Sequence, residues 1–383
     1  MVKELDKYTW DQLADEYPYV NELLCQPAAI KDFIEFYSSS AGRDALYAAR
    51  QDWETHRFSG VILAGMGSSM FACRVLDMVL CNSGIQVSHY DAGELLYYRS
   101  GQISCYSNPL YIFMSQSGES IEIVKLLSKI PESRPGSIIW GITNTEESTL
   151  ATGVPRCFFL HAGPESSVTS KTFCNSLLLA YLLGNVLVAG SEGEVDGVVE
   201  SLAAGVDDLV KELDHLLDKP TIAIGDRIAG FIGKDAKFIQ LVARGASLAT
   251  AEQVALNIKE MDKIPAEAMS GGQFRHGPVE MVTKDARVLL LASDDATREI
   301  SEGQAYDVAH RFGGGKIVYV SNKRCDKLEG DPRILPVIHN IVDPFLAPII
   351  EFVICQLFMV RFACVNRIEP GVFRYVTKIT KEG

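Results

Sequence analysis

Short runs of apolar, largely β-branched residues alternate along the chain with longer segments whose apolar residues recur at helical spacing. The strand-like runs of the first half are Val61–Ala64, Leu110–Met114 and Ser137–Ile142, and a helical segment such as Ser120–Lys129 follows the second of them. Strands that alternate with helices are typical of a parallel sheet covered by helices on both faces. The pattern therefore predicts an α/β fold of the doubly wound type.

These three runs recur in the second half of the chain, in the same order and at a constant separation. Equivalent positions just after the runs are residues 67 and 245, 115 and 293, and 144 and 322, and each pair is 178 residues apart. Three matches at one separation predict two similar α/β units. We expect a helical arm at 1–45, a first domain at 46–200 and a second domain at 201–383, with a linker rich in Gly and Ser at 191–205.

Two strongly apolar stretches, Ser176–Gly190 and Ile341–Val365, raise the question of a membrane span. The first is too short to cross a bilayer. The second carries Asp343, Glu351 and Arg361, and such residues are costly in lipid. Both stretches are therefore predicted to be buried helices, and no membrane partner is expected.

Composition narrows the range of partners. The 383 residues include 36 Lys plus Arg and 49 Asp plus Glu, for a formal net charge of −13, which would repel nucleic acid. Nine cysteines occur with no C-x-x-C pair and no Cys/His cluster at zinc spacing. The first residues lack the apolar core of a signal peptide. We expect a cytoplasmic protein without a metal site.

The segment Ser115-Gln-Ser-Gly-Glu-Ser120 is the strongest candidate for a binding site. It follows a predicted strand and begins a predicted helix, and ligands collect at the carboxyl ends of parallel strands. Its three hydroxyls, the Gln116 amide and the free N–H groups of the helix start could surround a phosphate with neutral donors. Alternatively, Ser117 and Ser120 could only cap the helix.

The equivalent segment of the second half favours the binding interpretation. It reads Ser293-Asp-Asp-Ala296, and its two carboxylates would repel a phosphate, so only the first domain is predicted to bind an anion. A second turn, Gly65-Met-Gly-Ser-Ser69, lacks the full dinucleotide-binding pattern. We expect it to offer Ser68 and Ser69 to a small polyhydroxylated ligand rather than to bind a nucleotide cofactor.

Two further residues are candidates for proton transfer. On a helix predicted at 248–261, spacing places Gln253, Asn257 and Glu260 on one face, and the helix dipole at the carboxyl end would raise the pKa of a buried Glu260. Such a carboxyl suits general acid–base catalysis, although an ordinary solvated glutamate beside Lys259 would look the same. His276 lies in a polar, glycine-flanked loop that would expose it, and histidine exchanges protons near neutral pH. Many loop histidines are nevertheless exposed without having a catalytic role.

Phe274-Arg-His-Gly-Pro278, with His276 sixteen residues after Glu260, resembles the sugar isomerase (SIS) family of tandem phosphosugar-binding domains. Ser115–Ser120 and Gly67-Ser-Ser69 share in the resemblance. The chain is similar to the isomerase half of glucosamine-6-phosphate synthase and to fructoselysine-6-phosphate deglycases. The resemblance implies two tandem SIS domains, each a parallel sheet flanked by helices.

The same resemblance implies roles for individual residues. Glu260 would be the catalytic carboxylate, and His276 would assist ring opening or proton transfer from a neighbouring subunit, which requires at least a homodimer. Asn257, like Gln253, stands where the synthase carries a charged residue, and Lys378 fits the terminal tail of the deglycases. The residues implied to contact the substrate are Ser69, Ser115, Gln116, Ser117, Ser120, Thr169, Asn257 and Lys378.

Together these expectations describe a phosphosugar enzyme that uses no metal or organic cofactor. The preferred activity is cleavage of a 6-phosphofructosamine to an aldose 6-phosphate and an amine. One alternative keeps the same proton transfer in an aldose–ketose phosphosugar isomerase or an aminosugar-phosphate deaminase. A second alternative is a phosphosugar sensor without catalytic activity.

Overall fold

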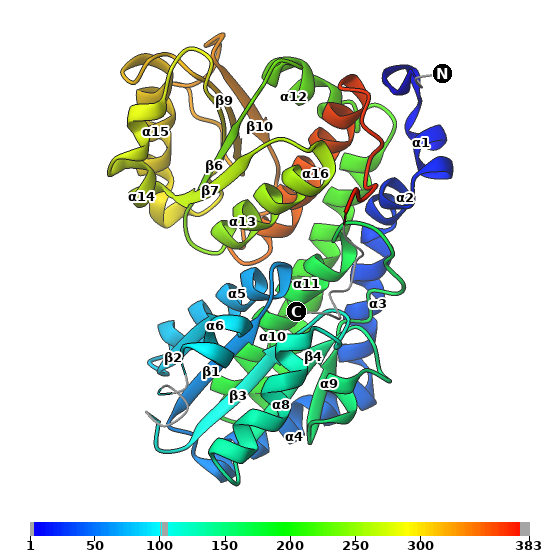
Figure 1. Ribbon diagram of the computed structural model, residues 1–383, viewed down its shortest axis with the longest axis vertical. Coiled ribbons are helices and arrows are strands. Elements are labelled where there is room, and N and C mark those ends of the chain that lie inside the picture. The colour runs from blue at the N-terminus through cyan, green and yellow to red at the C-terminus, as the bar shows by residue number, and fades with distance from the viewer. Residues whose placement is uncertain (1–3, 100, 102–105, 376–383) are drawn as a thin grey trace. The chain divides into compact units, whose positions relative to one another are not determined.

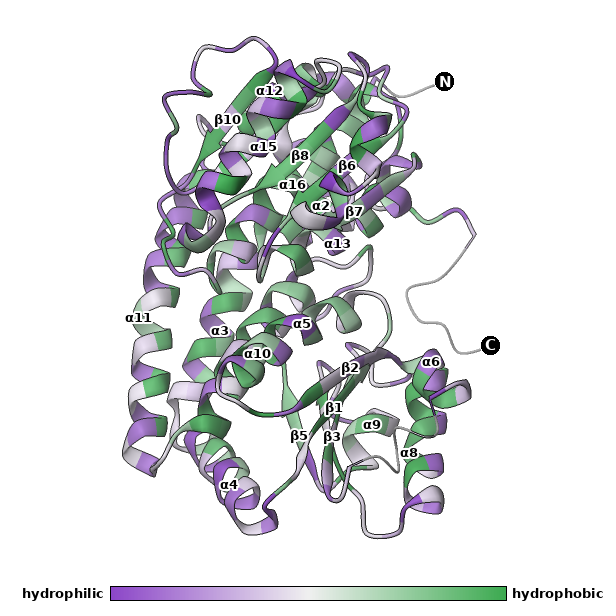
Figure 2. Cartoon of the chain, turned by 90° about the vertical axis from the view of Figure 1, so that its left-hand side faces the viewer, coloured by the Kyte–Doolittle hydropathy of each residue, from purple (hydrophilic) through white to green (hydrophobic). Residues whose placement is uncertain are grey.

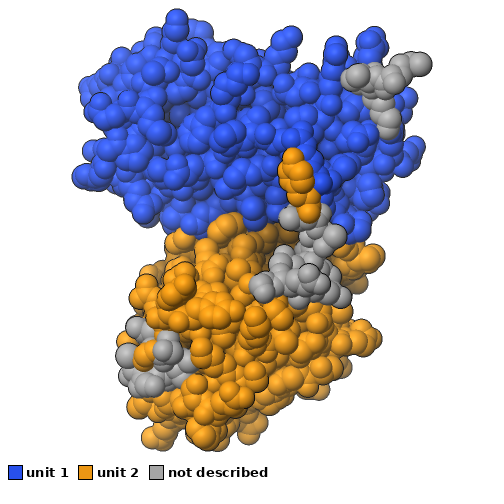
Figure 3. Space-filling view, in the orientation of Figure 1, with its two compact units in different colours: residues 1–27, 166–168, 207–374 blue, residues 28–165, 169–206, 375–383 orange. Residues whose placement is uncertain are grey.

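The computed structural model of the chain describes residues 4–99, 101 and 106–375 (Figure 1). The chain forms two compact units, which Figure 3 colours separately. The first-repeat unit comprises residues 28–165, 169–206 and 375–383, and the second-repeat unit comprises residues 1–27, 166–168 and 207–374. The expected helical arm is thus divided between the units after residue 27.

A parallel five-stranded sheet organises the first-repeat unit. Its strands are β1 (Gly60–Gly65), β2 (Val87–Asp91), β3 (Pro109–Met114), β4 (Ile138–Thr143) and β5 (Arg156–Phe159), in the order β2-β1-β3-β4-β5. Every neighbouring pair is parallel. Strands β1 and β3 are buried along their whole length, as the continuous apolar runs in the sequence predict.

Helices cover both faces of this sheet. One face packs against α6 (Ala92–Tyr97), α8 (Ile121–Ser133) and α9 (Thr149–Thr152) through a single apolar cluster. The other face packs against α5 (Ser68–Asn82), and α10 (Lys171–Val188) packs in turn on α5. Two further helices of the unit are α3 (Gln26–Ser38) and α4 (Ser40–His56).

The second-repeat unit contains a second parallel sheet with the same neighbours. Its strands are β6 (Ile239–Ala243), β7 (Ala266–Ser270), β8 (Arg287–Leu291), β9 (Lys316–Ser321) and β10 (Ile334–Ile338), in the order β10-β9-β8-β6-β7. Strands β3 and β8 begin at residues 109 and 287, β4 and β9 at 138 and 316, and β5 and β10 at 156 and 334. Each separation is 178 residues, so the predicted repeat is confirmed and extends to the fifth strand.

Helices α12 (Ile224–Ile232), α13 (Ser247–Asn257) and α16 (Ala347–Val365) pack together in this unit. Helices α14 (Gly271–Arg275) and α15 (Arg298–His310) contribute to a separate apolar cluster with β6, β8 and β9 of the second sheet. The chain begins with η1 (Leu5–Lys7), α1 (Trp10–Glu16) and α2 (Pro18–Leu24). Both units are therefore α/β layers, as predicted.

The linker expected at 191–205 is wrong, because these residues belong to the long helix α11 (Glu192–Leu217). Within it Val195, Val199, Leu202 and Val206 recur every three or four residues and are buried. This helical spacing of apolar side chains outweighs the helix-breaking tendency of the Gly and Ser residues between them. The composition of 191–205 predicts a linker, whereas the apolar period predicts the helix that is observed.

The two apolar stretches are helices α10 and α16, which Figure 2 shows largely in the hydrophobic colour. By length and composition either could cross a membrane, but 83% and 94% of their apolar windows are buried inside the fold. The prediction of buried helices is therefore confirmed. Glu351, a charged residue of α16, is held there by hydrogen bonds within the unit.

Candidate functional site

The loop after β3 is held in one tight conformation by its own hydroxyl groups. The buried Ser115 Oγ accepts the N–H of Gly118 at 3.1 Å and lies 3.1 Å from Ser120 Oγ. Ser117 Oγ accepts the N–H of Glu119 at 3.2 Å. Gly118 has φ +68°, and a Cβ atom there would lie 2.1 Å from Ser148 Oγ, so only glycine fits. The sequence thus fixes a serine-rich turn directly before α8.

The Gln116 side chain carries the clearest sign of a ligand. Thr169 Oγ1 donates to Gln116 Oε1 at 3.3 Å. Gln116 Nε2 is buried and has no acceptor among the described residues. A buried N–H donor without an acceptor costs free energy, so a ligand oxygen at this point would stabilise it. The structure therefore brings Thr169 to the loop, as the resemblance implies.

A second turn adjoins the loop, because β1 lies beside β3 in the sheet and Gly65 pairs with Met114. Helix α5 begins at Ser68, directly after this turn, and Ser69 in its first turn is 5% exposed. The amino ends of α5 and α8 thus follow neighbouring strands at one edge of the sheet. Both helix dipoles favour an anion at this edge.

The corresponding loop of the second-repeat unit is satisfied internally. Ser293 Oγ donates to Glu351 Oε1 at 2.5 Å and lies 2.9 Å from His339 Nε2, and all three side chains are buried. Burial lowers the pKa of His339 to about 3 and raises the pKa of Glu351 to about 7. Asp295 is paired with Lys323 at 2.8 Å. The hydroxyl of Ser293 is thus occupied by partners of its own unit.

The segment with Asn257 and Glu260 belongs to the second-repeat unit. Gln253 Nε2 donates to Asn257 Oδ1 at 2.6 Å, so these two side chains share one face of α13, as predicted, and both are buried. The helix then widens into a π-turn at Ile258–Asp262, which contains the half-buried Glu260. The prediction of a regular helix to residue 261 is wrong at this turn. The spacing that placed Glu260 on the face of Asn257 therefore does not apply.

Asp262, in the same π-turn, is a residue that sequence reasoning missed. Its side chain is fully buried, and neither carboxyl oxygen has a hydrogen-bond partner among the described residues. Burial raises its pKa well above the usual range. Val254 and Ile258 precede it at intervals of four residues and are also buried, but the π-turn interrupts the helical period, so the sequence gives no clear signal for the burial of Asp262.

This burial makes a prediction about stability. A carboxyl whose pKa is raised by folding costs no stability below its unfolded pKa of about 3.9, and the cost grows as the pH rises above that value. The Asp262→Asn variant cannot titrate at this position. Its free energy of unfolding minus that of the wild type should therefore increase by up to about 1.4 kcal/mol for each pH unit above pH 4. Urea unfolding at pH 4.5, 6.0 and 7.5 measures this difference.

The matched control is Asp235→Asn, since the Asp235 side chain is 77% exposed. The difference between this variant and the wild type should change little over the same pH range. A constant difference between Asp262→Asn and the wild type from pH 4.5 to 7.5 would show that the Asp262 carboxyl does not resist ionisation in the fold.

His276 follows the short helix α14, which begins with a capping box between Ser270 and Gln273. The histidine is exposed, as the polar loop predicted, and the following Gly277 has φ +128°. Strand β7 separates His276 from Glu260 along the chain, and both residues belong to the second-repeat unit. The loop residues and Thr169 belong to the first-repeat unit. Lys378 lies outside the described residues.

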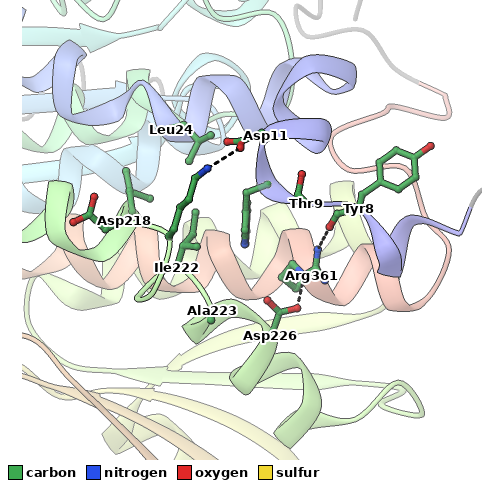
Figure 4. A pocket seen from close by; sticks show the side chains of 12 residues that line it. Tyr8, Thr9, Asp11, Leu24, Asp218, Ile222, Ala223, Asp226 and Arg361 are labelled. Atoms are coloured by element: carbon green, nitrogen blue, oxygen red, sulfur yellow. Dashed lines mark hydrogen bonds and ion pairs between the residues drawn. The ribbon is translucent and has the colours of Figure 1, made fainter.

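A cavity of about 580 Å³ in the second-repeat unit is lined by none of the predicted site residues (Figure 4). Both cations that line it are paired: Arg361 donates to Asp226 at 2.5 Å, and Lys219 lies 3.2 Å from Asp11. Among the described residues no three His, Cys, Asp or Glu side chains are grouped to hold a metal ion.

Comparison with known proteins places these features in a family. The family model for the SIS domain matches residues 59–190 and again residues 234–362. Glutamine–fructose-6-phosphate aminotransferase [isomerizing] of Streptococcus pneumoniae is 27% identical over 368 residues, covering 92% of this chain and 56% of the relative. The chain thus spans about half the length of the curated relatives it matches.

Solved structures share the fold. The carboxyl-terminal domain of glucosamine-fructose-6-phosphate aminotransferase from Francisella tularensis superposes with a TM-score of 0.78 at 21% identity, over 92% of this chain and 98% of that one. Tagatose-6-phosphate ketose/aldose isomerase from Escherichia coli gives a TM-score of 0.71 at 18% identity, over 92% and 93% of the two chains. At these identities the likeness establishes the fold.

Proposed function

The chain belongs to the SIS domain family, and from that premise we propose that it is an enzyme acting on a 6-phosphorylated sugar that carries an amine. The proposed substrate class is a 6-phosphofructosamine, and the products are an aldose 6-phosphate and the free amine. We further propose that the enzyme works in the cytoplasm as a homodimer. The observation that carries the proposal is the buried, unsatisfied Gln116 Nε2 in a serine-rich loop at the amino end of α8.

The loop supplies the binding part of the proposal. Neutral hydroxyl and amide donors would hold the phosphate of the substrate at Ser115, Gln116, Ser117 and Ser120, with the dipole of α8 as the favourable field. Ser69 and Thr169 would contact the sugar. Because the protein carries a formal net charge of −13, local donors of this kind are the physical means of holding an anion.

Glu260 supplies the chemical part. As a general base it would remove a proton from C1 of the open-chain ketoamine while the C2 carbonyl oxygen takes up a proton from water, which forms an enaminol with a double bond between C1 and C2. Return of the C1 proton to C2, with loss of the N–H proton to water, gives an imine at C1. Water then adds to the imine carbon, and the C–N bond breaks with release of the amine. His276 would assist opening of the sugar ring, which must precede these steps.

The isomerase alternative stops the same chemistry one step earlier. Proton transfer between C1 and C2 without C–N cleavage would interconvert a ketose and an aldose phosphate, and two of the similar proteins carry isomerase activity in their names. A deaminase would use the same transfer on an amino sugar phosphate. A sensor needs no acid–base group, so the presence of both Glu260 and His276 favours an enzyme.

A substrate panel separates these possibilities. Purified protein is incubated in turn with fructosyl-lysine 6-phosphate, fructosyl-glycine 6-phosphate, glucosamine 6-phosphate and fructose 6-phosphate, and amine release and sugar interconversion are followed by proton NMR. We expect free amine from the two fructosyl compounds only. Ammonia from glucosamine 6-phosphate would identify a deaminase, and interconversion of fructose 6-phosphate and glucose 6-phosphate would identify an isomerase.

A further inference from the structure

A cavity of about 510 Å³ lies at the amino ends of β6 and β8, and its volume falls in the range of small-molecule sites. The cavity therefore lies at the end of its sheet opposite the carboxyl ends of the strands. In the first repeat the serine-rich loop follows the carboxyl end of a strand, so the two sites are at different ends of their sheets. The apolar residues that line the cavity are Phe238, Phe274, Met281, Val282, Ala286 and Val288. The cavity therefore offers an aromatic and aliphatic wall within the second-repeat unit.

One polar group of the cavity lining has no protein partner for its acceptor atom. Gln240 is 3% exposed, and its Nε2 donates to the carbonyl oxygens of Leu241 and Glu267, both at 3.0 Å. Gln240 Oε1 accepts no hydrogen bond among the described residues. The opposite amide orientation would place Oε1 against two carbonyl oxygens, which can only accept hydrogen bonds. The two carbonyl groups therefore fix which atom of the Gln240 amide is Nε2 and which is Oε1. A buried acceptor is thus left for an N–H or O–H group.

The first repeat shows what occupies the equivalent place there. Residues 178 positions before Phe238 and Gln240 are Gly60 and Ile62. The buried ring of Tyr106 packs over Gly60, because a Cβ atom on that glycine would lie 2.6 Å from Tyr106 Cε1. In the first repeat the space is thus filled by a phenol ring beside an aliphatic residue. In the second repeat a cavity remains, and a glutamine replaces the aliphatic residue.

The charges around the cavity indicate a neutral ligand. Two acidic residues, Asp235 and Asp285, and two basic residues, Lys237 and Arg287, line it. Arg287 Nη2 lies 4.0 Å from Asp235 Oδ2, and this pair carries no net charge. Lys237 and Asp285 remain, so no excess of one sign is offered to a charged molecule.

We propose that this cavity binds a small, neutral, planar aromatic molecule whose single N–H or O–H group donates to Gln240 Oε1. The ring would pack against Phe238 and Phe274, much as Tyr106 fills the first repeat. Phe274 and Met281 stand on either side of His276 in the sequence. A ligand in the cavity would therefore contact both segments that flank the exposed histidine. This binding proposal does not depend on which sugar phosphate the protein uses.

The test compares indole with benzofuran, which has the same shape but an oxygen in place of the N–H group. Ligand-detected NMR titration of the full chain should give a Kd for indole below about 1 mM, and benzofuran should bind at least about tenfold more weakly. The Gln240→Leu variant should remove the preference for indole. If that variant fails to fold, the comparison of the two probes on the wild type still decides the role of the acceptor.

Met281→Trp tests the place of binding. Met281 is 48% exposed, so the larger ring can be accommodated at the rim, where it should block the cavity and weaken indole binding at least about tenfold. Ile300→Trp, at a residue equally exposed but outside the cavity, is the matched control and should bind indole like the wild type. Absence of indole binding to the wild type, equal binding of benzofuran, or unchanged binding in Met281→Trp would overturn the proposal.

Discussion

Glu260→Gln should lower the turnover number by about 10²–10⁴-fold while leaving the affinity for a sugar phosphate within a few-fold of the wild type. Glutamine keeps the size and the hydrogen-bonding capacity of the side chain but cannot accept and return a proton. Binding should survive, because the proposed phosphate ligands lie in the serine-rich loop. The two quantities are measured separately, by steady-state kinetics and by calorimetry with substrate or product.

Glu267→Gln provides the matched control for this variant. Glu267 is an exposed glutamate of the neighbouring strand β7, and its replacement should leave turnover unchanged. Full activity of the Glu260→Gln enzyme would remove Glu260 from the mechanism and would strengthen the sensor alternative. A loss of affinity as large as the loss of turnover would mean that Glu260 binds the substrate rather than moves a proton.

Mixing two inactive variants should restore activity if each active site takes its histidine from a neighbouring subunit. Neither Glu260→Gln nor His276→Ala homodimers should turn over substrate at an appreciable rate. A mixed dimer holds one site in which both groups are wild type. Random exchange makes about half of the dimers mixed, and each has one intact site of two, so about a quarter of wild-type activity is expected.

The exposure of His276 at the end of α14 makes this arrangement physically possible, because the side chain is presented outward. Exchange is verified by mass spectrometry of differently tagged chains, and activity is measured on the same mixture. No recovery in a mixture with demonstrated exchange would show that each subunit supplies its own histidine.

The inner strands of both sheets, β1, β3 and β4 in one and β6, β8 and β9 in the other, were predictable because strands buried in parallel sheets require nearly continuous apolar runs. The repeat was predictable for the same reason, since a constant separation of 178 residues preserves the register of strand and turn. The match of β5 with β10 is not evident from the sequence, because Arg156 begins one strand and Pro336 lies within the other, so neither is a continuous apolar run. Pairing with a neighbouring strand, which a single sequence does not reveal, makes both segments strands.

The candidate site was predictable where local chemistry determines it and was not predictable where tertiary packing does. Gly118 and the surrounding serines form the expected turn because their hydrogen bonds are made within the loop. The contact between Thr169 and Gln116 spans 53 residues, so only the resemblance suggested it. The π-turn around Glu260 depends on how α13 meets its neighbours, and helical periodicity assumes that such turns do not occur.

The central claim is that the serine-rich loop of the first repeat holds the phosphate, and calorimetry of sugar 6-phosphate binding tests it most directly. Removal of a hydrogen bond to an anion costs roughly 1.5–3 kcal/mol, so Ser117→Ala and Ser120→Ala should each weaken binding by about 10- to 100-fold. Ser293→Ala, at the equivalent loop of the second repeat, should leave affinity unchanged although it removes a buried hydrogen bond to Glu351. Equal losses of affinity at both loops, or none at Ser117 and Ser120, would contradict the account.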